Sequence, residues 1–208
     1  MKISTNTGGL AATNAYLIAD ETTGDAAMID APQDTVLPLL NVAKHHRWNV
    51  RYLLLTHGHW DHISDHKVYT DHYPHGKVLI HRLDEPKLQH PGSKIFQLPY
   101  IIQPRSADGH IQDDDEEIIG SIRLKAIFTP GHSPGHIAFY FAEENLLFGG
   151  DLLFAGSIGR TDLPDSDPNA MRQSLLRVMK LPDETLVYPG HGPQTSIGDE
   201  RQSNPYLT

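Results

Sequence analysis

The sequence has no cysteine, which excludes a disulfide framework, a redox-active cysteine pair and a thiolate metal ligand. It also has no apolar run long enough to cross a bilayer, and its start, MKISTNTGGL, lacks the apolar core of a signal peptide. No run of lysine and arginine is present, and the formal net charge is −9. These absences argue against nucleic-acid and membrane partners, and they make the cytoplasm the expected location.

The length and composition predict a single α/β domain over residues 1–208. The chain has 38% hydrophobic and 21% charged residues, an ordinary globular mixture, and it is long enough to bury a full core. No repeat, low-complexity tract or linker divides it. Predicted strands and helices alternate in two halves, which favours sheets covered by helices.

Short predicted strands are joined by polar loops rich in glycine and proline. Strands over 14–20 and 25–30 form a hairpin, and IAFYFAE (137–143) forms a second one with NLLFGG (145–150). Further strands are expected at 51–55, 77–81, 121–128 and 185–190. Helices are expected at about 34–48, with Asp34 as the cap and Val36, Leu39, Leu40 and Ala43 on one face, at about 63–72, and at 167–180. Residues 86–110 are rich in proline and predict a long excursion over a site.

The most unusual segment is THGHWDH, residues 56–62, which directly follows the apolar run RYLLL. In an extended chain, the side chains of residues i and i+2 point the same way, so His57 and His59 suit one cation. Asp61 and His62 follow where the chain is expected to turn into a helix, and they suit a second cation nearby. One HxH pair alone is more often a pair of surface histidines than a site.

Three further candidate ligands stand beside glycine, at or just beyond the end of a predicted strand. They are His132 in TPGH, Asp151 in FGGD and His191 in YPGH. Glycine permits backbone turns that other residues resist, and it leaves space beside a metal. Active sites in α/β proteins gather at such loops. Five histidines and two aspartates in this order predict a metal centre rather than a solvated surface.

This order of motifs, THGHWDH followed by PGH, GGD and PGHG, resembles the metallo-β-lactamase superfamily from about Asn14 onward. The resemblance implies a four-layer αββα sandwich with two divalent metal ions at one edge, zinc first, with iron or manganese as alternatives. It also implies the ligands: His57, His59 and His132 on the first metal, Asp61, His62 and His191 on the second, and Asp151 bridging both. A hydroxide that bridges the metals would attack a carbonyl carbon, with Asp61 and Asp151 as the catalytic carboxylates.

Two segments, GDLLFAGSIGRTDLPDSD and YPGHGPQTSIGDERQSNPYL, are similar to short glyoxalase II-like proteins, the hydroxyacylglutathione hydrolases. The resemblance implies a thioesterase that cleaves a small-molecule substrate, S-2-hydroxyacylglutathione. Arg160 stands where longer members have a lysine that contacts the glutathione carboxylate, so Arg160 is expected to bind substrate. True β-lactamases of this fold lack the bridging aspartate and many use a cysteine ligand, so Asp151 and the absence of cysteine disfavour antibiotic hydrolysis.

Two departures from glyoxalase II bear on the substrate. Full-length members have a C-terminal helical domain with further basic glutathione contacts, whereas this chain stops at Thr208 without a separate domain of that kind. Many relatives continue the first motif as HxGG, whereas this chain has HISD, so Ser64 and Asp65 are expected to narrow the entrance. The runner-up function is a persulfide dioxygenase with one iron. The iron ligands would then be His57, His132 and Asp151.

Lactonase chemistry, phosphodiester chemistry and a non-catalytic metal-binding role are weaker alternatives. Outside the ligand set, His136 is expected to support a ligand or the fold, and Asp30 either accepts a hydrogen bond from a ligand imidazole or caps a turn. The DDDEE run at 113–117 is expected to be a solvated turn before a strand. The other eight histidines are expected on the surface: His45, His46, His66, His72, His75, His81, His90 and His110.

Overall fold

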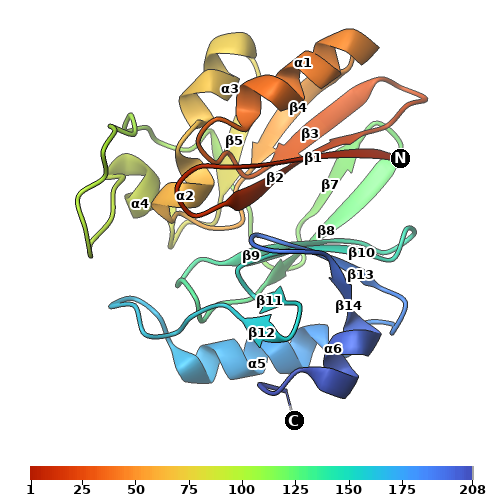
Figure 1. The fold of residues 1–208 in the computed structure, drawn as a ribbon. Coiled ribbons are helices and arrows are strands. Elements are labelled where there is room, and N and C mark those ends of the chain that lie inside the picture. Colours follow the sequence, from red (N-terminus) through yellow and green to blue (C-terminus); the bar gives the residue numbers. More distant parts are fainter. Residues whose placement is uncertain (208) are drawn as a thin grey trace.

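Two six-stranded sheets lie face to face at the centre of the computed structural model, which describes residues 1–207 (Figure 1). Sheet A has the order β1-β2-β3-β4-β5-β6, and sheet B has the order β14-β13-β10-β9-β8-β7. The helices α1 and α3 cover the outer face of sheet A, and α5 and α6 cover the outer face of sheet B (Figure 1). The result is the expected order of four layers, helix, sheet, sheet and helix.

Sheet A begins antiparallel and ends parallel. Its strands are β1 (Lys2–Gly8), β2 (Thr13–Ala19), β3 (Asp25–Ile29), β4 (Asn49–Leu54), β5 (Lys77–Ile80) and β6 (Gly109–His110). The pairs from β1 to β3 are antiparallel, and those from β3 to β6 are parallel. Parallel strands end at one edge, so the loop after β4 lies where sites in α/β sheets gather.

Sheet B is antiparallel apart from one pair. Its strands are β7 (Glu116–Ile119), β8 (Ile122–Phe128), β9 (Ile137–Phe141), β10 (Leu146–Gly150), β13 (Leu186–Pro189) and β14 (Thr195–Ser196). Strands β10 and β13 run parallel, so FGGD and YPGH leave the sheet side by side. A small hairpin of β11 (Leu153–Phe154) and β12 (Ser157–Ile158) follows β10.

The six helices of the described part of the chain are short. They are α1 (Val36–His46), α2 (Trp60–Ile63), α3 (His66–His72), α4 (Glu85–Gln89), α5 (Pro168–Val178) and α6 (Ile197–Ser203). Helix α5 begins at Pro168 because the Asp167 side chain accepts hydrogen bonds from two backbone amides of its first turn. None of the helices in residues 1–207 is long and apolar enough to cross a membrane.

Three apolar cores hold these layers together. Strand β2 is buried on both faces, and its side chains alternate between two cores. Leu17 packs with the α1 side chains Leu39 and Ala43, whereas Ile18 packs with Phe139 between the sheets. A third core lies between sheet B and helix α5. The strands at the site are therefore fixed from both sides.

Most predicted elements are confirmed, including both hairpins and the buried face of α1. The Asp34 cap was wrong, because Asp34 has a positive φ of 65° and Thr35 occupies the N-cap position. The helix predicted at about 63–72 is present as α3, which begins at His66, and the short helix α2 before it was not predicted separately. Strand β1 and helix α6 were not predicted. The 113–117 run was only partly a turn, because its last two residues begin β7.

Two of the eight histidines expected on the surface are buried. His66 Nε2 donates a hydrogen bond of 2.7 Å to the Gln103 carbonyl oxygen. His81 stacks on Phe128, with ring centroids 4.7 Å apart. Neither contact leaves a signal in the sequence, because each partner is more than 35 residues away.

Candidate metal centre

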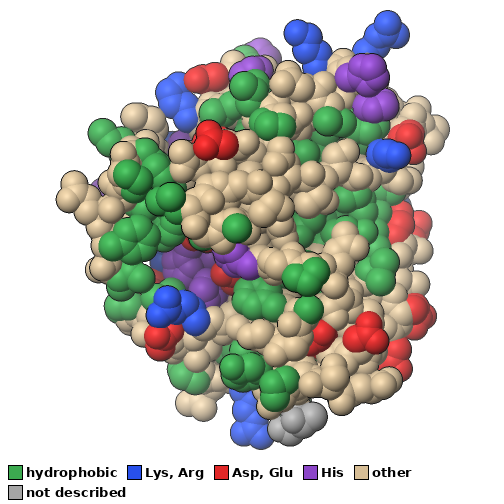
Figure 2. Space-filling model, in the orientation of Figure 1, with side chains coloured by type: hydrophobic (Ala, Val, Ile, Leu, Met, Phe, Trp, Pro, Cys, Tyr) green, Lys and Arg blue, Asp and Glu red, His purple; other side chains and the backbone are tan. Residues whose placement is uncertain are grey.

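Four loops at one edge of the sandwich bring the seven predicted ligands together. The loop after β4 and helix α2 carry four of them, and the loops after β8, β10 and β13 carry one each: His57, His59, Asp61 and His62, then His132, Asp151 and His191. Figure 2 shows histidine side chains in a hollow on this edge. The fold thus brings these seven side chains together, although some are more than 130 positions apart in the sequence.

Glycines make the close approach of these loops possible. Gly150 precedes Asp151 with a positive φ of 49°, and a Cβ there would lie 2.7 Å from His136 Nε2. A Cβ on Gly190 would overlap Asp151 Oδ1. Gly150 of FGGD and Gly190 of YPGH are thus required by the packing around the candidate ligands.

The first ligand group is a set of three imidazoles. His57 Nε2 lies 3.0 Å from His59 Nδ1, which lies 2.8 Å from His132 Nε2. Burial, followed by the neighbouring histidines, holds the pKa of His57 well below its usual value. Burial likewise lowers the pKa of His59 to about 4, with His132 the next cause. Protonation of His57 and His59 is therefore disfavoured near neutral pH, and neutral rings can act as metal ligands.

The second group combines a carboxylate with two imidazoles. Asp61 Oδ2 lies 3.7 Å from His62 Nε2 and 3.3 Å from His191 Nε2. Asp151 touches both groups, with Oδ1 3.3 Å from His62 Nε2 and Oδ2 3.3 Å from His132 Nε2. The same Oδ2 lies 3.4 Å from His191 Nε2. Asp151 thus occupies the position expected of a bridge.

The carboxylates reverse the electrostatics of the second group. Burial disfavours charge on His62, but Asp151, Asp30 and Asp61 outweigh it, so the pKa of His62 is raised well above its usual value. Burial also opposes charge on His191, yet hydrogen bonds to Asp151 and Asp61 raise its pKa to about 9. These carboxylates would favour a divalent cation in the same place for the same reason.

Three of the candidate ligand rings are held in place by contacts of their Nδ1 atoms. His62 Nδ1 lies 2.7 Å from Asp30 Oδ2, His132 Nδ1 lies 2.9 Å from the Arg160 carbonyl oxygen, and His191 Nδ1 lies 3.1 Å from the Ala11 carbonyl oxygen. Such contacts fix the tautomer and leave Nε2 free to face a metal. The first of the two roles considered for Asp30 is therefore present.

His136 supports the centre without belonging to it. Its Nε2 accepts a 3.0 Å hydrogen bond from the Asp151 backbone N–H, and its Nδ1 lies 2.8 Å from Thr129 Oγ1. Burial lowers the pKa of His136 to about 3. The supporting role expected for His136 is confirmed.

Asp84, a buried carboxylate that joins two loops of candidate ligands, was not predicted from the sequence. Its oxygens accept hydrogen bonds from Gly58 N (2.8 Å), Ser133 Oγ (2.7 Å) and Gly135 N (2.8 Å). Lys87 Nζ donates a fourth at 3.0 Å. Burial works against the Asp84 charge, but these donors prevail and its pKa is lowered. The fixed position of one aspartate beside α4 therefore sets both the HxH loop and the PGH loop.

The ligands open into a cavity of about 620 Å³. Residues 90–96 line it, so the predicted excursion at 86–110 does reach the site. Arg160 also lines it, but its Nε and Nη2 donate to Asp162 at 2.6 and 2.7 Å.

Ser64 and Asp65 do not line this cavity, so the expectation that they narrow its entrance was wrong. Ser64 Oγ donates to the Trp60 carbonyl oxygen at 2.6 Å. The Asp65 carboxylate instead meets backbone amides at the start of α1. The Asp65 carboxylate, which follows the HxHxDH motif, therefore contacts the start of α1 and does not face the cavity.

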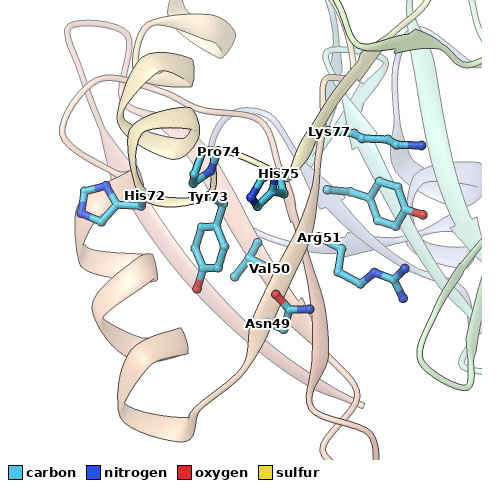
Figure 3. Close-up of a pocket in the computed structure, with 10 residues that line it drawn as sticks. Asn49, Val50, Arg51, His72, Tyr73, Pro74, His75 and Lys77 are labelled. Atoms are coloured by element: carbon cyan, nitrogen blue, oxygen red, sulfur yellow. The ribbon is translucent and has the colours of Figure 1, made fainter.

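A second cavity, about 470 Å³ in volume, lies at the amino ends of β4 and β5 (Figure 3). It is the opposite end of these strands from the ligands. His72 points away from Arg51 and Lys77, so its basic groups do not converge (Figure 3). Arg51 is also paired with Asp25 at 3.3 Å. This cavity is therefore separate from the candidate centre.

A family model described as the metallo-beta-lactamase superfamily matches residues 8–191. The chain belongs to the metallo-β-lactamase superfamily. The match spans all seven ligand positions, and the four observed layers are the fold expected of this superfamily. The chain is thereby a member of a metallo-hydrolase superfamily that binds metal ions.

Several superfamily members resemble the chain over nearly its whole length. The hydroxyacylglutathione hydrolase GloC of Haemophilus influenzae is 32% identical over 203 residues, which cover 93% of this chain and 92% of that protein. The crystal structure of the BLEG-1 B3 metallo-β-lactamase is 33% identical, with a TM-score of 0.91 and full coverage of both chains. TTHA1623 in a di-iron-bound form is 36% identical, with a TM-score of 0.80 and coverage of 98% and 100%.

The residues present fit the metal ions of a metallo-β-lactamase superfamily member. His62 Nε2 and Asp151 Oδ1 are buried without a hydrogen-bond partner, although they lie 3.3 Å apart. Buried polar atoms are rarely left unpaired, and each such atom costs about 1–3 kcal/mol. The three rings of the first group also aim nitrogens at one another at 2.8–3.0 Å, close to the spacing of about 3.3 Å between ligands of one tetrahedral zinc. A cation in each group would satisfy both observations.

Proposed function

We propose that the chain is a binuclear metal-dependent thioesterase that hydrolyses S-2-hydroxyacylglutathione. One observation carries the proposal: the complete second group, Asp61, His62 and His191, shares Asp151 with the first group. A mononuclear site would not use the second group. The likeness to hydroxyacylglutathione hydrolase GloC supports the choice of thioester.

The proposed division of the ligands is the one that the family resemblance implies. His57, His59 and His132 would hold one ion, Asp61, His62 and His191 the other, with Asp151 between them. Zinc is the first choice for the pair, and the di-iron form of TTHA1623 supports iron as the alternative. When bound, two divalent ions supply an activated water and polarise a carbonyl oxygen.

Asp61 is the proposed proton acceptor. Its Oδ2 already accepts a 3.0 Å hydrogen bond from Thr13 Oγ1, which fixes the carboxylate at the floor of the cavity. Hydrogen bonds and charges from His62 and His191 outweigh burial and lower the pKa of Asp61, so it is ionised at neutral pH. An ionised and fixed carboxylate can take a proton from a water beside it.

Arg160 is the proposed contact for a glutathione carboxylate. The pair with Asp162 uses Nε and one Nη2 hydrogen, which leaves the Nη1–Nη2 edge of the guanidinium available. Asp162 then orients the group, and the free edge can bind a second carboxylate bidentately. The Arg160 side chain lines the same cavity as Asp61 and Asp151, so it can reach a substrate bound there.

β-Lactam hydrolysis is a second candidate. The observation in its favour is the BLEG-1 structure, which covers the whole chain with a TM-score of 0.91. This likeness weakens the sequence-based argument against antibiotic hydrolysis. The two candidates share the metal centre and differ in what the cavity accepts.

Anaerobic turnover tests the proposal. The purified protein, with its metal content determined, is supplied with S-lactoylglutathione, with a chromogenic cephalosporin, or with glutathione persulfide in air. We expect thioester hydrolysis without oxygen, and we expect His191→Ala to abolish it. His72→Ala is the matched control, because His72 is the last residue of α3 and does not line the cavity. Oxygen consumption with the persulfide and full activity of His191→Ala would establish the dioxygenase instead. Turnover of the cephalosporin alone would establish the lactamase.

A further inference from the structure

The cavity above the metal-type ligands has more apolar wall than a small hydroxyacyl group can use. Five of the proposed ligands lie at its floor: His59, Asp61, His132, Asp151 and His191. Its volume of about 620 Å³ lies within the range of pockets that enclose drug-sized ligands. A lactoyl group has only three carbon atoms and would occupy a small part of this space.

One wall is aromatic and unusually exposed. Trp60 stands between two proposed ligands in the sequence, and its ring meets Phe96 edge-on with centroids 5.4 Å apart. Phe96 and its neighbour Ile95 are 44% and 59% exposed. In Figure 2, hydrophobic side chains border the hollow that contains the histidines. Grouped exposed apolar side chains beside a cavity mark a binding surface.

The opposite wall is also apolar. Phe154 and Ile158, from the hairpin β11–β12, line the cavity together with Leu163. The Phe154 ring lies 6.0 Å from the His191 ring, so this wall reaches the proposed metal ligands. A group held between the two walls would therefore be attached close to the reacting carbonyl.

Two of the three lysine and arginine side chains that line the cavity are paired with carboxylates, and the third, Lys94, lies on the exposed 90–96 segment. Lys87 is engaged by Asp84 at 3.0 Å and by Asp165 at 2.8 Å. Arg160 is engaged by Asp162, and its side chain is 54% exposed. Lys87 and Arg160 are therefore held by carboxylates, and the space between the two apolar walls suits an apolar group.

We propose that Trp60 and Phe96 on one side, with Phe154 and Ile158 on the other, hold an acyl group with a large apolar or aromatic substituent. The reaction assigned to that acyl group rests on the proposed function, but the apolar subsite does not. The preferred thioester then carries a bulky acyl group in place of lactoyl. A carrier carboxylate lies outside this subsite, at Arg160.

Tryptophan fluorescence measures the subsite without turnover. The chain has two tryptophans, and Trp48 is buried in the core at 7% exposure, so a ligand in the cavity changes the emission of Trp60. The purified protein is titrated with S-methyl-, S-butyl-, S-hexyl- and S-benzylglutathione, thioethers that cannot be hydrolysed. Each methylene buried should tighten binding by up to about fourfold. Trp60→Phe should abolish the fluorescence change, which assigns the signal.

Phe96→Ala is the decisive variant, and Ile101→Ala is its matched control. Ile101 is 85% exposed and lies outside the cavity lining, so its loss should leave every affinity unchanged. Phe96→Ala should weaken S-hexyl- and S-benzylglutathione by about tenfold while leaving S-methylglutathione unchanged, with an unaltered melting temperature. Equal affinities across the series, or equal losses in both variants, would overturn the subsite.

Turnover then separates this inference from the proposed function. Acetyl, hexanoyl and phenylacetyl thioesters are compared on glutathione and on N-acetylcysteamine, which has no carboxylate. A kcat/KM that rises with acyl size on both carriers supports the subsite, even if glutathione gives no advantage and the proposed carrier is wrong. A kcat/KM that is highest for the smallest acyl group on both carriers contradicts the subsite while leaving thioester hydrolysis intact.

Discussion

Replacement of Asp84 by alanine should both destabilise the protein and release metal, although Asp84 is not among the proposed ligands. Its carboxylate is fully buried and accepts hydrogen bonds from Gly58, Ser133 and Gly135. The first donor lies in the HxH loop, and the other two lie in the loop of His132. Asp84→Ala would leave these donors buried without an acceptor.

The expected loss follows from those contacts. A buried donor left unpaired costs about 1–3 kcal/mol, and the three costs are not fully additive, so a total of roughly 3–5 kcal/mol is expected. The pKa of Asp84 is lowered despite burial, which shows that the site favours the charged carboxylate. Lys87 keeps its ion pair with Asp165, at 2.8 Å, which limits the loss of stability. For a domain of this size, the melting temperature should fall by about 6–20 °C.

Thermal unfolding and elemental analysis of the same samples measure both effects. Asp71→Ala is the control, because Asp71 also pairs with a lysine, at 2.7 Å, but both side chains are more than half exposed. Such surface pairs contribute about 0–1 kcal/mol. A difference of two degrees or less between the melting temperatures of Asp84→Ala and Asp71→Ala corresponds to about 1 kcal/mol or less. Such a result would show that Asp84 does not stabilise the two loops.

Three further substitutions test separate parts of the account. Asp151→Ala should lower the metal content toward one ion per chain and sharply reduce hydrolysis, because one carboxylate touches both groups; two retained ions with near-normal turnover would contradict the bridge. Arg160→Ala should raise KM about tenfold or more for a glutathione thioester, with little change in kcat or in turnover of the N-acetylcysteamine thioester. Equal losses on both carriers would make the Asp162 pair purely structural. Burial raises the pKa of Asp65 to about 6, so the folded protein holds this proton more tightly than the unfolded chain, and the associated stability is lost as pH rises from about 4 through 6. Asp65→Asn should flatten that part of the dependence of melting temperature on pH, and an unchanged slope would disprove it.

Most strands and helices could be predicted from local pattern, whereas the candidate ligand set followed from the resemblance of the motif order to a known family. Alternating apolar residues mark β8, and the glycines before Asp151 and His191 mark turns that other residues resist. The motif order was sufficient to bring together residues as distant as His57 and His191. The signals for strands and turns lie within a few residues of the feature they predict, whereas the motif order spans most of the chain.

Contacts between distant loops could not be predicted in the same way. Asp84 stands in HRLDEPKL, which offers no sign that its carboxylate will meet Gly58 and Gly135. Asp65 was assigned to the entrance because it follows the first motif, yet tertiary packing turns its side chain toward α1. Strand β1 was missed although it has seven residues, because none of them is fully buried and its exposure alternates only weakly. Packing, rather than propensity, decides such positions.

Metal content and thioester hydrolysis, determined on one sample, test whether the chain is a two-metal thioesterase. The protein is purified, its metals are counted by elemental analysis, and the same sample is assayed anaerobically before and after removal of metal by a chelator. We expect two divalent ions per chain, with hydrolysis that is lost on chelation and restored by two equivalents of metal. Full hydrolysis by a protein with one ion would contradict the two-metal centre. A two-metal protein that hydrolyses no thioester would contradict the proposed reaction.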